Sequence, residues 1–312
     1  MGFFDIFKTK FLDPSEHIGQ SDLILNDGTH ILHDCKNVIL SGKAIVVEAK
    51  NTTFSEITGK AKLQIMDNCE IFELCKQAKI GLIKSGSICT VKGKAVITTI
   101  NNAQIDYVQG KAKIGSLNNG SIKFMDDQTE LSTMNNGKIG FIRGKARICT
   151  MIEGSIVGMM NNSEVSTFNT GKIDYVLNNS NIGTMNSGEI GEICDYAEIT
   201  TQNSGSIGTM LGSSVVCSQM SGSVGLRAGN SMILYEQNKT KAQKMASFTD
   251  ISIVKMELPK EEAKTEIKAE EIKAEDTKTE EPKVEKQKKS KKKTEKSVET
   301  EPVTLETTTD KK

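Results

Sequence analysis

A repeat of seventeen residues runs through most of this chain and constrains its fold more than any other feature. Large apolar residues return at alternating intervals of eight and nine residues, after two initial intervals of nine. The series is Ile45, Phe54, Leu63, Ile71, Ile80, Ile88, Ile97, Ile105, Ile114, Ile122, Leu131, Ile139, Ile148, Ile156, Val165, Ile173, Ile182, Ile190, Ile199, Ile207, Val216, Val224 and Ile233. A fixed period of this kind indicates a repeat architecture, in which each unit packs on its neighbours.

Seventeen residues are too few for a pair of helices, but they fit one coil of a β-solenoid. A small residue lies two positions before many of these anchors, as Ala112 and Ala146 do, and another apolar residue lies three positions after them, as Leu117 and Met151 do. The first spacing is typical of a strand with one face inward, and the second is what a corner between strands produces. The pattern predicts an all-β, single-stack β-solenoid (β-helix) of about eleven coils over residues 38–233.

Asn and Gly also keep fixed places in this period. Because both tolerate a positive φ, we expect their columns to form turns, and we expect stacked Asn side chains to form a hydrogen-bonded ladder. One column holds Asn101, Asn118, Asn135, Asn169, Asn186 and Asn203, and another holds Gly86, Gly120, Gly137, Gly154, Gly171, Gly188, Gly205 and Gly222.

Composition limits the cellular compartments and the kinds of partner that we expect for this protein. The formal net charge is +0 at pH 7, which gives no argument for a specific nucleic-acid partner. The seven cysteines form no C-x-x-C pair, and scattered free thiols favour a reducing compartment. The sequence shows no secretory signal and no apolar span long enough to cross a membrane. We therefore expect a cytoplasmic protein.

Residues 1–12 are expected to form a short amphipathic helix. Phe3, Phe4, Ile6, Phe7 and Phe11 would share one broad face, with lysines at its edges. Such a helix can insert at the headgroup boundary of an anionic membrane, or it can dock on a partner protein. The alternatives are that it caps the first coil or that it is disordered.

Residues 13–37 are out of register with the repeat and are expected to be an irregular lead-in or cap. They contain all three histidines, of which His30 and His33 precede Asp34 and Cys35 at a spacing that a metal site could use. Because no second pair of ligands lies nearby, we interpret them as surface histidines and expect no metal.

After the repeat, residues 234–256 are expected to be a C-terminal cap or transition. Residues 257–312 are rich in Lys and Glu, with few large apolar residues, and are expected to be disordered. A basic block within them includes Lys288, Lys289, Lys291, Lys292 and Lys293. It is suited to electrostatic contact with an acidic membrane, a nucleic acid or a partner protein, or it serves as a solubilising bristle.

One column of the repeat is aromatic. Tyr107, Phe124, Phe141 and Tyr175 lie two residues after their anchors, with Gly158 between the last two. If the column faces outward, it forms a side stripe suited to partner contact. The repeat itself contains no histidine, no phosphate-binding loop and no recurring pair of carboxylates. We expect no catalytic residues, no cofactor and no enzyme activity.

In plan, the chain resembles the bactofilins: a Gly- and Ile/Val-rich β-solenoid rod with about seventeen residues to a coil, set between disordered or membrane-directing ends. The resemblance covers residues 38–233. It implies a non-enzymatic cytoskeletal scaffold that assembles end to end, without nucleotide, at the inner face of the membrane. The alternative is a β-solenoid binding module, such as a phage fibre or adhesin-like component, that presents its side stripes to a partner.

The ends of the rod distinguish these two functions. A terminal coil exposes unpaired backbone groups, which must be capped or paired with another molecule. Bare ends favour a homopolymer, whereas capped ends favour a monomer or a small oligomer.

Overall fold

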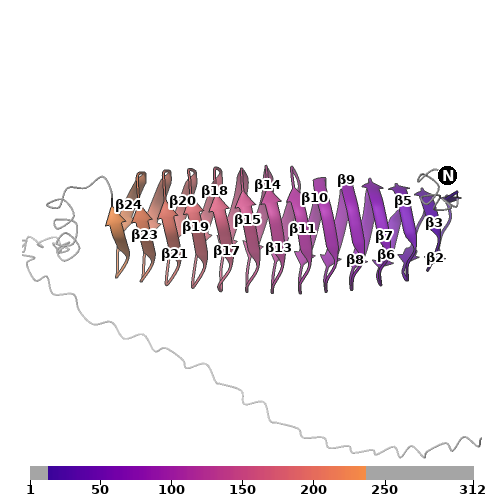
Figure 1. The fold of residues 1–312 in the computed structure, drawn as a ribbon, viewed down its shortest axis with the longest axis horizontal. Helices are drawn as coiled ribbons and strands as arrows, with labels where there is room; N and C mark the ends of the chain where they lie inside the picture. The colour runs from indigo at the N-terminus through magenta and orange to yellow at the C-terminus, as the bar shows by residue number, and fades with distance from the viewer. Residues whose placement is uncertain (1–12, 237–312) are drawn as a thin grey trace, which may run out of the picture. The chain divides into compact units, whose positions relative to one another are not determined.

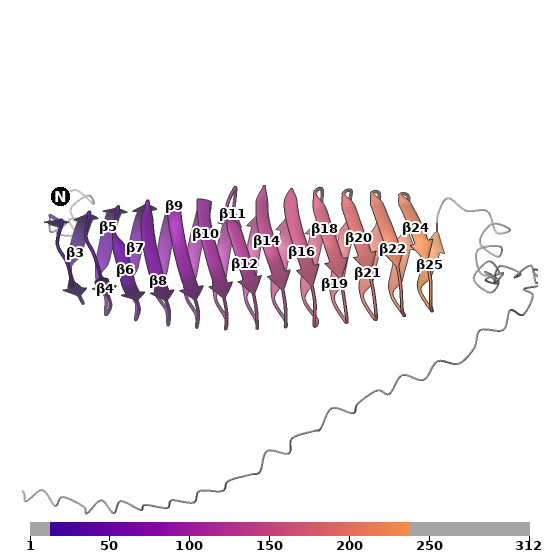
Figure 2. The ribbon, with the colours of Figure 1, turned by 180° about the vertical axis from the view of Figure 1, so that it is seen from behind.

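The computed structural model describes residues 13–236, which form 25 parallel β-strands and contain no helix (Figures 1 and 2). In chain order the strands are β1 (Ser15–Ile18), β2 (Ile24–Leu25), β3 (Thr29–His33), β4 (Val38–Leu40), β5 (Ile45–Lys50), β6 (Thr53–Ile57), β7 (Lys62–Asp67), β8 (Cys69–Leu74), β9 (Lys79–Val91), β10 (Val96–Val108), β11 (Lys113–Leu117), β12 (Ser121–Met125), β13 (Glu130–Met134), β14 (Gly137–Ile142), β15 (Arg147–Met151), β16 (Gly154–Met159), β17 (Glu164–Phe168), β18 (Lys172–Val176), β19 (Asn181–Met185), β20 (Glu189–Ile193), β21 (Glu198–Gln202), β22 (Ser206–Met210), β23 (Val215–Gln219), β24 (Ser223–Arg227) and β25 (Met232–Glu236). The predicted β-solenoid is confirmed.

The strands belong to two columns that run along the rod. The first column contains β1, β3, β5, β7, β9, β10, β11 and the odd-numbered strands up to β25, and the second contains β2, β4, β6, β8, β9, β10, β12 and the even-numbered strands up to β24. The long strands β9 and β10 pass through both columns. Residues one coil apart pair side by side, as Ile114, Leu131 and Ile148 do. The seventeen-residue period of the sequence therefore sets the register in which neighbouring strands pair.

The N-terminal coils are shorter than the rest. Ser15 pairs with His30, fifteen residues on, and the pairing of β3 with β5 shifts register between His30 and Ile31. Residues 13–37, expected to be a lead-in or cap, thus pair with the rod as its first coils. Their coils have fifteen or sixteen residues, so the seventeen-residue period does not extend to them. The solenoid has about 13 turns, so the expected number of about eleven was too low.

The core is a thin column of mainly aliphatic side chains along the axis, with Phe54 and Phe168 among its largest members. The anchors and the apolar residues three positions later are buried together, as Ile114 and Leu117 are in β11 and Ile122 and Met125 are in β12. Small residues two positions before the anchors, such as Ala112, are also buried. A large side chain at that position would not fit beside the anchors of the same coil.

The expected Asn ladder is present. Asn118 donates to Asn101 over 2.8 Å and Asn135 donates to Asn118 over 2.7 Å; beyond Ile152 the ladder resumes from Asn169 to Asn203. These Asn residues do not have the positive φ that we expected of them. Their hydrogen bonds to the coils on either side explain the column without any left-handed backbone.

Candidate assembly and binding surfaces

The N-terminal end of the described stack has open strand edges. β1 pairs only with β3, and β2 pairs only with β4, so their outer edges meet no other described strand. Ile18 is 62% exposed and Ile24 is 64% exposed on this coil. Unpaired N–H and C=O groups beside exposed apolar side chains form a template for another strand.

The C-terminal end has the same character within residues 13–236. The outer edge of β24 meets no other described strand, since β24 pairs with β22 alone among them. Leu226 is 60% exposed and Leu234 is 63% exposed. Ile24 and Leu226 occupy the two ends of one lattice column, the column that carries the aromatic stripe.

The structure brings three of the four stripe residues together. The rings of Tyr107 and Phe124 stack with centroids 5.3 Å apart and planes 11° apart, and Phe124 and Phe141 stack at 5.9 Å and 15°. Each of the three is half-buried. Tyr175 lies beyond Gly158 and is 46% exposed. The stripe is thus a three-ring stack followed by a separate tyrosine.

An ion pair covers the outer side of this stack. Arg143 donates two hydrogen bonds to the carboxylate of Asp126, over 2.7 and 2.8 Å, and its guanidinium carbon lies 4.7 Å from the centre of the Phe124 ring. The bonds to Asp126 raise the pKa of Arg143 further. Arg143 was not singled out from the sequence, although its seventeen-residue distance from Asp126 was the available signal. Because Arg143 and Asp126 pair with each other and cover the rings, we interpret the stack mainly as an element that stabilises the rod, and only secondarily as a binding surface.

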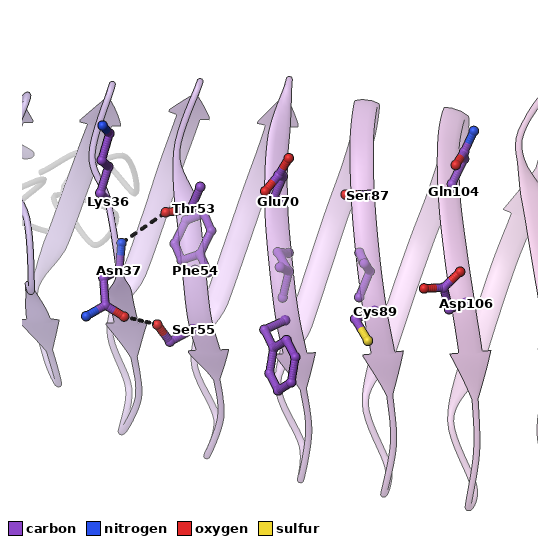
Figure 3. A pocket seen from close by; sticks show the side chains of 13 residues that line it. Lys36, Asn37, Thr53, Phe54, Ser55, Glu70, Ser87, Cys89, Gln104 and Asp106 are labelled. Carbon is purple, nitrogen blue, oxygen red and sulfur yellow. Dashed lines mark hydrogen bonds between the residues drawn. The ribbon is translucent and has the colours of Figure 1, made fainter.

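A groove lies on the second column, toward the N-terminal half of the rod (Figure 3). Its volume is about 620 Å³, and it is lined by Lys36, Asn37, Thr53, Phe54, Ser55, Glu70, Ile71, Phe72, Ser87, Ile88, Cys89, Gln104 and Asp106. At the edge of the groove, the backbone N–H of Asn37 donates a hydrogen bond to the hydroxyl of Thr53, and the side-chain oxygen of Asn37 accepts one from the hydroxyl of Ser55 (Figure 3). Phe72 is 69% exposed.

The groove continues along the axis. A second hollow of about 410 Å³ shares Gln104 and Asp106 with it and extends to Val157. Lys123 and Lys138 lie along this second part, whereas Lys36 and Glu70 lie along the first. The two hollows follow successive coils, so an extended chain lying parallel to the axis would fit them. The repeat pattern alone did not reveal this groove.

Glu56, Glu73 and Cys75 are the one group of three potential metal ligands among residues 13–236. Cys75 donates to Glu56 over 3.3 Å, and Glu73 pairs with Lys92 at 2.7 Å. The hydrogen bond from Lys92 lowers the pKa of Glu73, while burial raises the pKa of Cys75 to about 11. The thiol keeps its proton at neutral pH, and the group is satisfied by its own hydrogen bonds.

Two sets of expected contact residues lie outside the described residues. They are Phe3, Phe4, Ile6, Phe7 and Phe11 in the first segment, and Lys288, Lys289, Lys291, Lys292 and Lys293 in the last. No helix among residues 13–236 is long and apolar enough to cross a membrane.

No family model matches this chain, and comparisons with curated proteins and with solved structures give no match either.

Proposed function

We propose that this protein is a non-enzymatic structural scaffold of bactofilin type, whose rods join end to end without nucleotide. One observation carries the proposal: the outer edges of β1 and β2 at one end of the described stack, and of β24 at the other, meet no further described strand. Such edges gain backbone hydrogen bonds when a second rod continues the stack.

Apolar contact adds to these hydrogen bonds. Ile18 and Ile24 at one end, and Leu226 and Leu234 at the other, are more than half exposed in the single rod. Burying apolar surface contributes roughly 25 cal/mol per Å². A second rod placed on either end would cover part of these side chains together with the open edges.

Charge variants at the ends test this proposal. We expect Leu226→Lys with Leu234→Lys, and separately Ile18→Lys with Ile24→Lys, to keep the rod folded but to leave it as single particles in sedimentation velocity. The matched control is Tyr196→Lys, because Tyr196 is 71% exposed but lies in the turn between β20 and β21, inside the stack. Wild-type protein and the control should sediment as long assemblies. End variants that assemble like the wild type would contradict the proposal.

The proposed location is the inner face of the cytoplasmic membrane, reached through residues 1–12. Five apolar side chains on one face of a helix, with lysines at its edges, suit an anionic bilayer. Flotation with vesicles containing phosphatidylserine should recover the full chain, and a Phe3→Ser, Phe7→Ser variant should stay unbound. Binding that persists in this variant and is lost with the Lys288–Lys293 block would instead point to the tail.

The axial groove favours a second candidate function, a binding module that presents its side to an extended partner. Phe72 would be the apolar contact, since it is exposed beside polar groove residues. Arrays of polysaccharides and of peptides should show a ligand that is lost in Phe72→Ser and kept in Tyr196→Ser. Equal signals from both variants would exclude the groove.

A further inference from the structure

Two histidines close the hydrophobic core at its N-terminal end. His17 in β1 pairs with Leu32, and His30 in β3 pairs with Val46; both partners are fully buried. In the following coils the equivalent positions hold apolar core residues, such as Ala49 after Leu32 and Leu63 after Val46. The two imidazoles therefore occupy core positions at the end of the stack. His30 is only 9% exposed, which differs from the surface position expected for it.

The rings face each other at short range. Nε2 of His17 lies 3.2 Å from Nδ1 of His30, and the ring centroids are 5.3 Å apart. The outer nitrogens have oxygen partners: Nε2 of His30 lies 2.7 Å from the carbonyl oxygen of Asp27, and Nδ1 of His17 lies 3.0 Å from Oε1 of Gln20.

These partners determine where the ring hydrogens lie. The backbone carbonyl oxygen of Asp27 only accepts, so Nε2 of His30 carries a hydrogen that it donates; with the amide of Gln20 turned so that Oε1 faces Nδ1, His17 donates in the same way. A neutral imidazole has one such hydrogen, and both facing nitrogens are then left with lone pairs directed at each other. Two lone pairs 3.2 Å apart repel unless a proton or a metal ion lies between them.

We infer that His17 and His30 form a binding site for a divalent transition-metal ion, with Zn²⁺ as the reference ion. Zinc binds imidazole nitrogen at about 2.0–2.1 Å, so two ligands at a tetrahedral angle lie about 3.3 Å apart. The observed 3.2 Å fits that separation. A ring N–H donated to a carbonyl is also the usual outer contact of a metal-binding histidine.

The site offers two protein ligands and leaves its other positions to water. No third His, Cys, Asp or Glu among the described residues joins this pair within a common ligand radius. The nearby thiol of Cys35 donates to the carbonyl oxygens of His17 and His33, each over 3.4 Å. A bound ion would join β1 to β3 and stabilise the first coil by mass action.

Zinc titration by calorimetry tests the site on the full-length protein, with Ni²⁺ as a second imidazole-binding ion. We expect one ion per chain, and affinity at least about tenfold lower in His17→Ala and in His30→Gln. His33→Ala is the matched control, because His33 lies in the same strand as His30 but is not part of the pair. It should bind as the wild type does.

A second variant shows whether any loss of zinc binding comes from misfolding and not from loss of a ligand. Gln20 is exposed, and Gln20→Leu removes only the acceptor that orients His17, so it should keep the melting temperature of the metal-free protein and weaken zinc binding about tenfold. The inference is overturned if no saturable binding of one ion occurs, if His17→Ala binds zinc unchanged, or if blocking the cysteines removes all binding.

Discussion

Ile152 interrupts the Asn ladder, and its replacement by Asn should complete the ladder. Asn135 has its side-chain oxygen directed toward position 152, since its nitrogen already donates to Asn118. Asn169 accepts from Asn186 and leaves its own nitrogen for position 152. In the Ile152→Asn variant, the new side chain would donate to Asn135 and accept from Asn169.

The expected gain follows from two opposing terms. Two new hydrogen bonds contribute about 2 kcal/mol in total, at about 1 kcal/mol each. Ile152 is 43% exposed, so its loss removes roughly 1 kcal/mol of apolar burial. The variant should therefore be about 1 kcal/mol more stable than the wild type. Ile152→Ala loses the burial without gaining the bonds and should be about 1 kcal/mol less stable.

Urea denaturation followed by circular dichroism measures the difference, provided that the slopes agree among the variants. The Asn and Ala variants should differ by about 2 kcal/mol, and this difference should shrink in an Asn135→Ala background because one bond is then unavailable. Equal stability of the Asn and Ala variants, or a difference unaffected by Asn135→Ala, would refute the ladder as a source of stability.

Three further predictions concern single residues. Gly154→Ala should destabilise the rod by at least about 2 kcal/mol in the same assay, because φ is 124° and a Cβ would lie 2.3 Å from the carbonyl oxygen of Gly137. Gly158→Ala should cost less, because its Cβ would meet only side-chain atoms, those of Phe141 and Met160. Because the pKa of Glu73 is lowered in the folded protein, its pairing with Lys92 stabilises the fold above pH 4.5, and this stabilisation is lost as the pH falls through the lowered pKa. In the Glu73→Gln variant, the free energy of unfolding should therefore depend less on pH in the acid range. Since the pKa of Cys75 is raised to about 11, iodoacetamide at pH 8 should label Cys75 slowly in the folded protein and rapidly in urea, as mass spectrometry would show.

The regular part of the fold could be predicted from the sequence because one rule repeats. Each coil places its anchor on the previous anchor, so Ile114 and its equivalents reveal the register without any knowledge of distant contacts. The rule fails where coil length changes. Residues 13–37 keep the same pairing with fewer residues per coil, and their strands became evident only in three dimensions.

The candidate sites were harder to predict, since they depend on side-chain direction. The stripe residues could be found as a column, but their stacking and the cover by Arg143 required the geometry of the rings. His17 and His30 are thirteen residues apart in a coil of fifteen, so neither the seventeen-residue lattice nor a ligand-spacing motif brings them together.

Negative-stain electron microscopy of the full-length protein, without added nucleotide, tests end-to-end assembly most directly. With about 13 turns, and a spacing of about 4.8 Å between turns, one rod is about 60 Å long. We predict filaments one rod wide and many times longer than 60 Å. Separate rods of about 60 Å at every protein concentration would contradict end-to-end assembly.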